Sequence, residues 1–572
     1  MGSQTCAYVA SKSDPESWHG AESSTFHLDK VPARGGLGIE EWQCPHPPLE
    51  RDDESDNDDN QYCVFHTDPP NVPDDIDESE VLLDAIQDAG DGPWSDRPEH
   101  RGQFVGATFG TIDLSAETIM ATDYHDLRFD HARFQANNEN LNFRATTFVT
   151  KGRHPISFAG TQFITTGEGD VAFRNATFQA DGKGDVAFPD VTFQTRSEGR
   201  VLFTGATFRT DDQGEVTFPD ATFQTDGEGD LLFPGATFLT VGEGDLLFDD
   251  AKFRTDGKGS VVFQGVTFRT YGKGSVDFLN ATFRAYGEGK VLFPNSTFRT
   301  DGKGHVEFSN TVFRADGEGD VKFPGATFQT DGEGDVAFSD AAFQTDGEGD
   351  VAFYSSTFRT NSGGNVTFRD AILHKADCRR IAFADANFGG VDLTEIDLRE
   401  ANVANISVNG ATTCERLNEE SDFDAEAWDA TARAYHQLKT VFSEHGLVGR
   451  ARNMHVRERR VRSLESKAAN GWFDRRHLLS LFSRVFTGYG VQVRYLMGWM
   501  AVLFLVSTAV YVIASVEDTL AENISYSVLA FTVAPPRIPS ESWVQFVMVV
   551  ETFFGTLSIV LLGYILGNRE QF

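Results

Sequence analysis

Several residue types that often carry structure or chemistry are scarce in this sequence. Five cysteines in 572 residues are too few for a disulfide framework. The 49 basic residues are outnumbered by 86 acidic ones, and the net charge of −37 argues against a nucleic-acid partner bound through phosphates. Met1–Asp14 has no apolar run, so we expect no secretory signal. Such an acidic surface suits high salt, and we expect a halophilic protein.

Catalytic motifs are missing as well. The sequence contains no recognisable nucleophile–base pair, phosphate-binding loop or catalytic metal motif. Serine, histidine and aspartate are present, but they are scattered over a repetitive region. We therefore expect that this protein is not an enzyme.

Phenylalanine, in contrast, is frequent, with 50 Phe against 12 Tyr and 7 Trp. From Phe158 to Phe358 it recurs as fourteen pairs, with a gap of five and a period of 15. A small or β-branched residue stands two positions before nearly every Phe of these pairs, as Val171 does before Phe173. This alternation predicts short strands with both side chains on one face. Glycine-containing turns such as Asp226–Gly229 separate the pairs.

The flanks of this region follow a simple period of five. Bulky residues recur from Phe104 to Phe134 and from Phe383 to Val408, in strings such as Ala386-Asn387-Phe388-Gly389-Gly390. The pattern resembles that of pentapeptide-repeat proteins. The resemblance implies a mainly β fold, a right-handed, four-sided parallel β-helix with the bulky residue and the small one before it pointing inward. We assign residues 101–413 to such a solenoid.

The middle of the solenoid departs from that family because every third pentad is polar, as in Asp226–Asp230. A 20-residue coil, made of four pentads, would turn Glu228 or Lys258 inward and bury an unpaired charge, which costs several kcal/mol. A 15-residue coil, made of three pentads, would stack Phe on Phe and leave the glycine turns exposed. We expect the 15-residue coil, with ion pairs along the turns rather than a calcium site.

Residues 1–70 hold three of the five cysteines, and two of them stand in tight couples with histidine, Cys44 with His46 and Cys63 with His66. Thiolate and imidazole are ligands that tetrahedral zinc prefers, and four protein ligands make a site structural. The predicted ligands are Cys6, Cys44, Cys63 and His66, with His46 as a substitute. The alternative is three free thiols in a loosely folded acidic segment. Residues 71–100, rich in proline and acid, are predicted to be an acidic linker.

Residues 414–492 change both period and charge. Apolar residues three or four apart from Trp428 to Phe442 predict an amphipathic helix. Residues 450–494 then contain 11 basic and three acidic side chains. A basic run directly before an apolar span marks the cytoplasmic side and suits contact with anionic lipid headgroups.

Residues 493–572 contain two long apolar segments. Tyr495–Ala514 has no charged residue, and Trp543–Leu566 has one, Glu551. Each is long enough to cross a hydrocarbon core of about 30 Å. We predict a cell-membrane protein with two spans, cytoplasmic N- and C-termini, and an external loop over residues 515–541.

The external loop contains an apolar stretch of about ten residues, which is too short to span and suited to re-entering the membrane. Such a stretch needs protein or a water-filled cavity around it, which implies several copies around an axis. On Tyr526-Ser527, Phe531–Val533 and Glu551–Gly555, the module resembles the two-helix pore of the potassium-channel superfamily. The resemblance implies a homotetramer with a re-entrant pore helix. Its pore or filter residues would be Thr532, Val533, Ala534, Glu551 and Gly555.

The filter glycines of that family are absent, because Thr532-Val533 is followed by Ala534-Pro535-Pro536. We therefore assume no potassium selectivity. The favoured function is an ion-channel-like membrane protein whose cytoplasmic solenoid is a scaffold or sensor. The alternative is a non-conducting anchor whose β-helix binds proteins; a DNA-mimicking β-helix is disfavoured by its interspersed Lys and Arg. The expected partners are further copies of the chain, lipid and ions, without nucleic acid.

Overall fold

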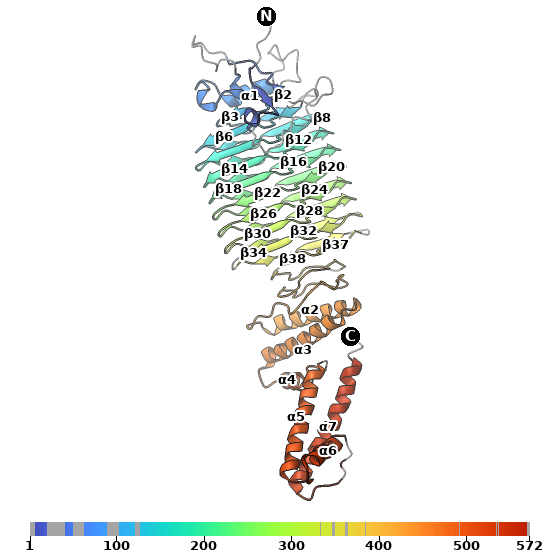
Figure 1. The fold of residues 1–572 in the computed structure, drawn as a ribbon. Coiled ribbons are helices and arrows are strands. Elements are labelled where there is room, and N and C mark those ends of the chain that lie inside the picture. The colour runs from blue at the N-terminus through green and yellow to red at the C-terminus, as the bar shows by residue number, and fades with distance from the viewer. Residues whose placement is uncertain are drawn as a thin grey trace. The chain divides into compact units, whose positions relative to one another are not determined.

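The chain forms two compact units, Met1–Asp397 with Asn405–Thr413, and Leu398–Ala404 with Cys414–Phe572. The first is a parallel β-solenoid with an N-terminal cap, and the second is helical (Figure 1). The structure is a computed structural model. It describes residues 6–19, 41–49, 62–87, 102–120, 126–331, 333–345, 349–360, 364–373, 375–383, 385–490, 492–532, 535 and 537–568.

Four parallel sheets form the walls of the solenoid, and each coil contributes one strand to each sheet (Figure 1). Two walls are built from longer strands: a ten-stranded sheet from β3 (Thr108–Phe109) to β38 (Ile372–Leu373), and a nine-stranded sheet from β4 (Thr118–Met120) to β36 (Thr357–Thr360). The other two walls are built from two-residue strands. They run from β7 (Leu141–Asn142) to β35 (Val351–Ala352), and from β5 (Leu127–Arg128) to β37 (Val366–Thr367).

One coil of the middle region consists of six pentads, so the expected 15-residue coil is wrong. A coil passes through β10 (Gln162–Thr166), β11 (Val171–Ala172), β12 (Thr177–Gly182) and β13 (Val186–Ala187) before β14 (Thr192–Ser197) pairs with β10. In that pairing Phe163 lies beside Phe193. Each sequence unit of three pentads therefore builds half a coil, with one short wall and one long wall.

The polar pentad explains why the coil is longer than both the 15-residue and the 20-residue coil that the sequence suggested. After Phe223 the strand continues for one more inward position, where buried Thr225 donates from Oγ1 to the Gly229 carbonyl at 2.6 Å. A Cβ at Gly229 would lie 1.8 Å from the Gly199 carbonyl oxygen, so only glycine fits this corner. Glu228 faces outward beside the corner, away from the core. The pentad thus lengthens one wall without burying a charge.

Oppositely charged side chains pair along these corners, and each pair joins the turns of two successive coils. Lys273 Nζ lies 2.5 Å from Glu243 Oε1, and Lys303 Nζ lies 3.0 Å from Glu333 Oε2. Exposed pairs of this kind contribute little each, about 0–1 kcal/mol. Their role in the fold is to neutralise the stacked acidic turns.

The core of the solenoid consists of stacked phenylalanine rings. Phe188 and Phe218 lie 4.6 Å apart between ring centroids, and Phe233 and Phe263 lie 4.5 Å apart, with parallel planes in both pairs. Rings of neighbouring columns meet edge to face, as Phe178 does with Phe188 at 83°. Both arrangements suit the aromatic quadrupole, so the excess of Phe over Tyr and Trp is a packing requirement.

The coil contracts where the polar pentads end. Phe358 stacks on Phe383, five pentads further along the chain, and Phe368 stacks on Phe388, four pentads further along. A parallel bridge then joins Asn387 to Ser407, which are again four pentads apart. The C-terminal coils therefore have the circumference that four uninterrupted pentads predict.

In the described part of the N-terminal cap, β1 (Val9–Ser11) and β2 (Glu41–Gln43) pair antiparallel. The same part contains the short 3₁₀ helices η1 (Pro15–Trp18), η4 (Val64–His66) and η5 (Pro69–Asn71), and the helix α1 (Glu78–Gln87). Helix α1 lies within the predicted linker. It buries Leu82 and Ile86, and Glu78 Oε2 accepts from the Gly110 N–H of the solenoid at 2.7 Å.

The helical unit contains α2 (Ala425–Glu444), α3 (Val448–Asn470), α4 (Arg475–Thr487), α5 (Val493–Ile513), α6 (Leu520–Phe531) and α7 (Ser542–Asn568). Part of the basic segment is paired within the helical unit, since Arg462 bonds Asp429 of α2 and Glu465 of α3. Helices α5 and α7 are long and apolar enough to cross a membrane.

Candidate functional site

The first candidate site is the junction of α5, α6 and α7, where one carboxylate joins the three helices. Glu551 of α7 is fully buried and accepts hydrogen bonds from Tyr511 Oη of α5 at 2.7 Å and from Ser527 Oγ of α6 at 2.5 Å. Each carboxylate oxygen therefore has a partner on a different helix. An acid buried in this way fixes the position of the shorter helix relative to the two long ones.

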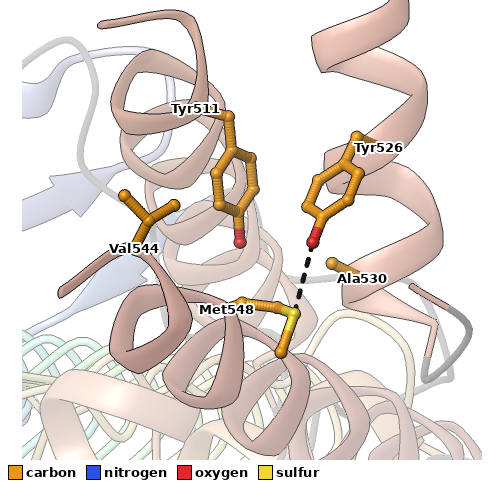
Figure 2. Close-up of a cluster of buried hydrophobic side chains, with 5 residues drawn as sticks. All are labelled: Tyr511, Tyr526, Ala530, Val544 and Met548. Carbon is orange, nitrogen blue, oxygen red and sulfur yellow. Dashed lines mark hydrogen bonds between the residues drawn. The ribbon is translucent and has the colours of Figure 1, made fainter. Parts of the chain in front are cut away.

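Apolar packing surrounds this carboxylate. Tyr511, Tyr526, Ala530, Val544 and Met548 form one buried cluster (Figure 2). The two tyrosine rings meet edge to face at 4.9 Å, and Tyr526 Oη donates to Met548 Sδ at 3.2 Å. The cluster draws residues from all three helices.

Helix α6 is defined at both ends. Thr519 and Glu522 form a capping box at its start. At its end, α7 approaches closely, because a Cβ at Gly555 would lie 2.7 Å from the Phe531 carbonyl oxygen. Thr552 Oγ1 of α7 also donates to the Ala530 carbonyl at 2.9 Å. The predicted Glu551 and Gly555 therefore both lie where α7 contacts α6.

The remaining predicted pore residues are less informative. Thr532 is exposed at the C-terminal cap of α6, and its Oγ1 donates to the Val528 carbonyl at 2.9 Å. Val533 and Ala534 lie outside the described residues. Arg537 bonds Glu517, so it does not pair with Glu551. The sequence analysis did not single out Tyr511 as a partner of Glu551. Its hydroxyl group within an apolar segment is the feature that could have identified it.

The second candidate site is the cysteine–histidine cluster of the cap. The ligand atoms of Cys6, Cys44, Cys63 and His66 all lie within 4.8 Å of one another. The Sγ atoms of Cys44 and Cys63 are 3.7 Å apart, and His66 Nδ1 is 3.2 Å from Cys63 Sγ and 3.9 Å from Cys6 Sγ. The four predicted ligands are thus brought together and could hold a metal ion.

The cap positions this cluster through local structure. The pairing of β1 with β2 places Cys44 beside the first strand, with the Cys44 N–H donating to the Tyr8 carbonyl at 3.0 Å. Cys63 is the N-cap of η4 and His66 is its last residue, and the His66 N–H donates to the Cys63 carbonyl at 3.0 Å, so one short turn brings the two together. His46, the predicted substitute, instead bonds the Gln103 carbonyl through Nε2 at 2.8 Å.

Burial and mutual hydrogen bonding set the protonation of the three thiols. Burial raises the pKa of Cys44 and of Cys63 well above the ordinary value. Hydrogen bonds from Cys44 and Cys63 lower the pKa of Cys6 far below it. The three thiols share their hydrogen bonds, and a cation bound among them would favour their deprotonated forms.

The family described as Pentapeptide repeats (8 copies) matches residues 364–411. The chain contains pentapeptide repeats. The matched segment coincides with the coils that have contracted to four pentads, whereas the wide coils of six pentads lie outside it. The family describes a structural repeat and not a catalytic domain.

A solved structure of HetL, a pentapeptide repeat protein involved in heterocyst differentiation regulation from the cyanobacterium Nostoc sp. strain PCC 7120, is also similar. The two sequences are 14% identical over 55% of this chain and 90% of HetL, with a TM-score of 0.13. That score is too low for us to draw any conclusion from the likeness. The comparison with curated proteins finds no match. Neither candidate site lies within the pentapeptide repeats at residues 364–411.

Proposed function

We propose that this is an integral membrane protein whose α5–α6–α7 module is channel-like, with the solenoid on the cytoplasmic side as a scaffold or sensor. The observation that carries the proposal is the three-helix junction at Glu551. A short helix is fastened between two span-length helices by a fully buried acid. An ionisable residue within a span marks a functional region by default.

The surfaces of the two long helices support membrane insertion. Large apolar side chains stand exposed on both, among them Leu505 at 64%, Phe546 at 69% and Val560 at 64%. In water such a surface would be a large apolar patch, and lipid is the natural cover for it.

Helix α4 supports the same placement. It exposes Leu478, Leu479, Phe482 and Val485, and it precedes α5 directly. Arg475, Arg476 and Arg484 lie on the same short helix. A basic amphipathic helix of this kind lies in the membrane interface with its apolar face inward. Its arginines, together with those of α3, favour the cytoplasmic side for both termini and the solenoid.

Helix α6 has 12 residues, a length of roughly 18 Å at 1.5 Å per residue, so it is too short to span the bilayer. We place it as a re-entrant helix. Its backbone then needs neighbouring protein or a water-filled cavity, which further copies of the chain would supply. Four copies follow from the resemblance to potassium channels, and lipid and ions are the remaining partners.

A non-conducting membrane anchor is the second candidate, and a specific observation favours it. The segment after Thr532 reads Val-Ala-Pro-Pro, without the glycines of a potassium filter. In addition, both oxygens of Glu551 are used inside one chain. As an anchor of this kind, the protein would use its two long helices only to tether the solenoid, and the solenoid would recruit proteins at the membrane.

Single-channel recording of the purified full-length protein in planar bilayers, at high salt, distinguishes the two functions. We expect discrete conductance steps that Glu551→Gln alters, because the substitution weakens the fastening of α6. Glu541→Gln, at an exposed acid of the same module, is the matched control and should leave the steps unchanged. Ion substitution then gives the selectivity. Silence from protein shown to be folded and oligomeric would overturn the channel and support the anchor.

A further inference from the structure

We propose that Cys6, Cys44, Cys63 and His66 bind one zinc ion, and that this ion fastens the N-terminal cap over the open end of the phenylalanine core. The cluster is distinct from the membrane module and does not depend on the channel-like function. It lies in the solenoid unit, between the cap and the first coil.

The open end of the solenoid needs a cover. A β-solenoid exposes its apolar core at both ends unless a terminal element seals it. Here Phe65 of the cap packs on Phe104 at 5.0 Å and on Phe109 at 5.8 Å, and His46 stacks on Phe104 at 4.9 Å. Phe65 lies between Cys63 and His66, so the residues that seal the core are neighbours of the ligands.

The described part of the cap has little regular structure to hold itself together. Each strand of its sheet has only three residues, and residues 1–100 contain 24 acidic side chains against five basic ones. Small segments that cannot build a sufficient core are commonly fastened by a disulfide or a metal. The four ligands come from three separate points between Cys6 and His66, so one ion would cross-link the cap.

The distances fit one tetrahedral ion. Zinc at about 2.3 Å from sulfur and 2.0–2.1 Å from nitrogen places two ligating sulfurs about 3.8 Å apart and sulfur from nitrogen about 3.6 Å. The Sγ atoms of Cys44 and Cys63 are 3.7 Å apart, and His66 Nδ1 lies 3.2 Å from Cys63 Sγ and 3.9 Å from Cys6 Sγ. All four ligand atoms lie within 4.8 Å of one another, close enough for one ion to draw them together. Three Cys and one His form a closed structural set, which leaves no position open for water.

The surroundings of the ligands are those of a metal site. His66 Nε2 lies 2.9 Å from the Val105 carbonyl, which makes Nε2 the protonated nitrogen and leaves the Nδ1 lone pair for the ion. The Cys63 N–H donates to Cys6 Sγ at 3.1 Å, a bond that stabilises a thiolate. Tyr8 stacks on the His66 ring at 3.7 Å and fixes its plane. Val105 belongs to the first coil, so the imidazole joins the ion to the solenoid.

The test is metal analysis of the full-length protein, purified in detergent under reducing conditions with zinc in the growth medium. We expect about one zinc per chain, since all four positions are filled by protein. Cys63→Ser and His66→Ala should lose the metal, while His66→Cys should keep it as a four-cysteine site. Cys378→Ser, at a buried cysteine of the solenoid wall, is the matched control and should keep the zinc.

Cobalt replacement of the zinc in the unaltered chain gives a readout that does not depend on a variant folding. We expect thiolate-to-cobalt charge transfer and the intense visible bands of a tetrahedral site, and His66→Cys should shift those bands. Limited proteolysis should cut the cap faster after chelation, with the solenoid intact. Any one of three results would overturn the proposal: zinc-free protein with three free thiols, a Cys44–Cys63 disulfide found by mass spectrometry, or equal zinc loss in Cys378→Ser.

Discussion

At the scale of single residues, the solenoid wall contains an acid in an unfavourable place. Asp277 of β25 (Val276–Asp277) is half-buried. Burial together with the nearby carboxylates of Asp249, Asp245 and Glu307 raises the pKa of Asp277 to about 7. Asp249 Oδ1 is itself buried without a hydrogen-bond partner. The parallel stacking of coils brings these acids together, since Asp277 and Glu307 are in register.

Asp277→Asn should therefore stabilise the protein in a pH-dependent way. The folded pKa lies above that of the unfolded chain, so the folded state holds an extra proton from about pH 4 to pH 7 and loses stability as pH rises through that window. We expect the variant to gain on the order of 1–3 kcal/mol at pH 8 and almost nothing at pH 4. The measurement is the thermal unfolding midpoint at both pH values and moderate salt.

Asp340→Asn is the control for this prediction, because Asp340 is an exposed aspartate in the same region of the solenoid. It should change the unfolding midpoint little at either pH. A gain for Asp277→Asn that is equal at pH 4 and pH 8 would show that packing, and not charge, is responsible.

At the scale of elements, the register of the strands decides the shape of the coil. The sequence repeats every three pentads, but the strands pair every six pentads. The two halves of a coil are similar in sequence and lie on opposite walls. The sequence period alone is compatible with either circumference, because side-chain alternation fixes which residues point inward and not how many strands complete a turn.

Engineered disulfides test this register. Lys252 of β22 (Lys252–Thr255) and Thr282 of β26 (Thr282–Ala285) are in register on adjacent strands. Neighbouring strands lie about 4.8 Å apart, within the Cα separation that a disulfide accepts. We expect Lys252→Cys with Thr282→Cys to form a cross-link under mild oxidation, detected by mass spectrometry of peptides.

The matched pair is Lys252→Cys with Thr267→Cys, separated by one sequence period instead of two. Thr267 lies on β24 (Thr267–Gly272), in a different sheet. This pair should stay reduced within a chain. A cross-link in this pair and none between positions 252 and 282 would mean that one sequence period completes a coil. The five native cysteines are buried, so they should not compete.

At the scale of the whole molecule, acidic and basic residues are segregated along the chain. The acidic excess extends through the cap and the solenoid, whereas residues 450–494 before the first span are basic. Under the proposed membrane insertion, this distribution favours a cytoplasmic solenoid, because positive residues beside a span remain on the cytoplasmic side. The proposed function depends on that orientation, since it determines which compartment the solenoid can sense.

Cysteine labelling checks the orientation. Phe473, 87% exposed, lies before α4, and Ser540 lies in the loop before α7. In intact cells a membrane-impermeant maleimide should label Ser540→Cys, while Phe473→Cys should react only after permeabilisation. Low background is expected because the native cysteines are buried. Labelling of Phe473→Cys alone in intact cells would place the solenoid outside.

The sequence by itself determined the features that depend on local pattern. The Phe period gives the inward positions of the solenoid, hydropathy gives α5 and α7, and the Cys–His couples give a candidate metal site. These features are readable because side-chain alternation and apolar length are properties of a single segment. The sequence also identified the polar pentads as turns, but not that they lengthen one wall of each coil.

The tertiary structure decided the features that depend on contacts between segments distant in the sequence. The coil of six pentads follows from where buried Thr225 and Gly229 close a corner, which no count of residues predicts. His66 joins the cluster because its Nδ1 lies 3.2 Å from Cys63 Sγ, whereas the ring of His46 stacks on Phe104. The partners of Glu551, Tyr511 and Ser527, are distant in the sequence and lie on two other helices. Such contacts are set by packing between elements, and local periodicity contains no information about them.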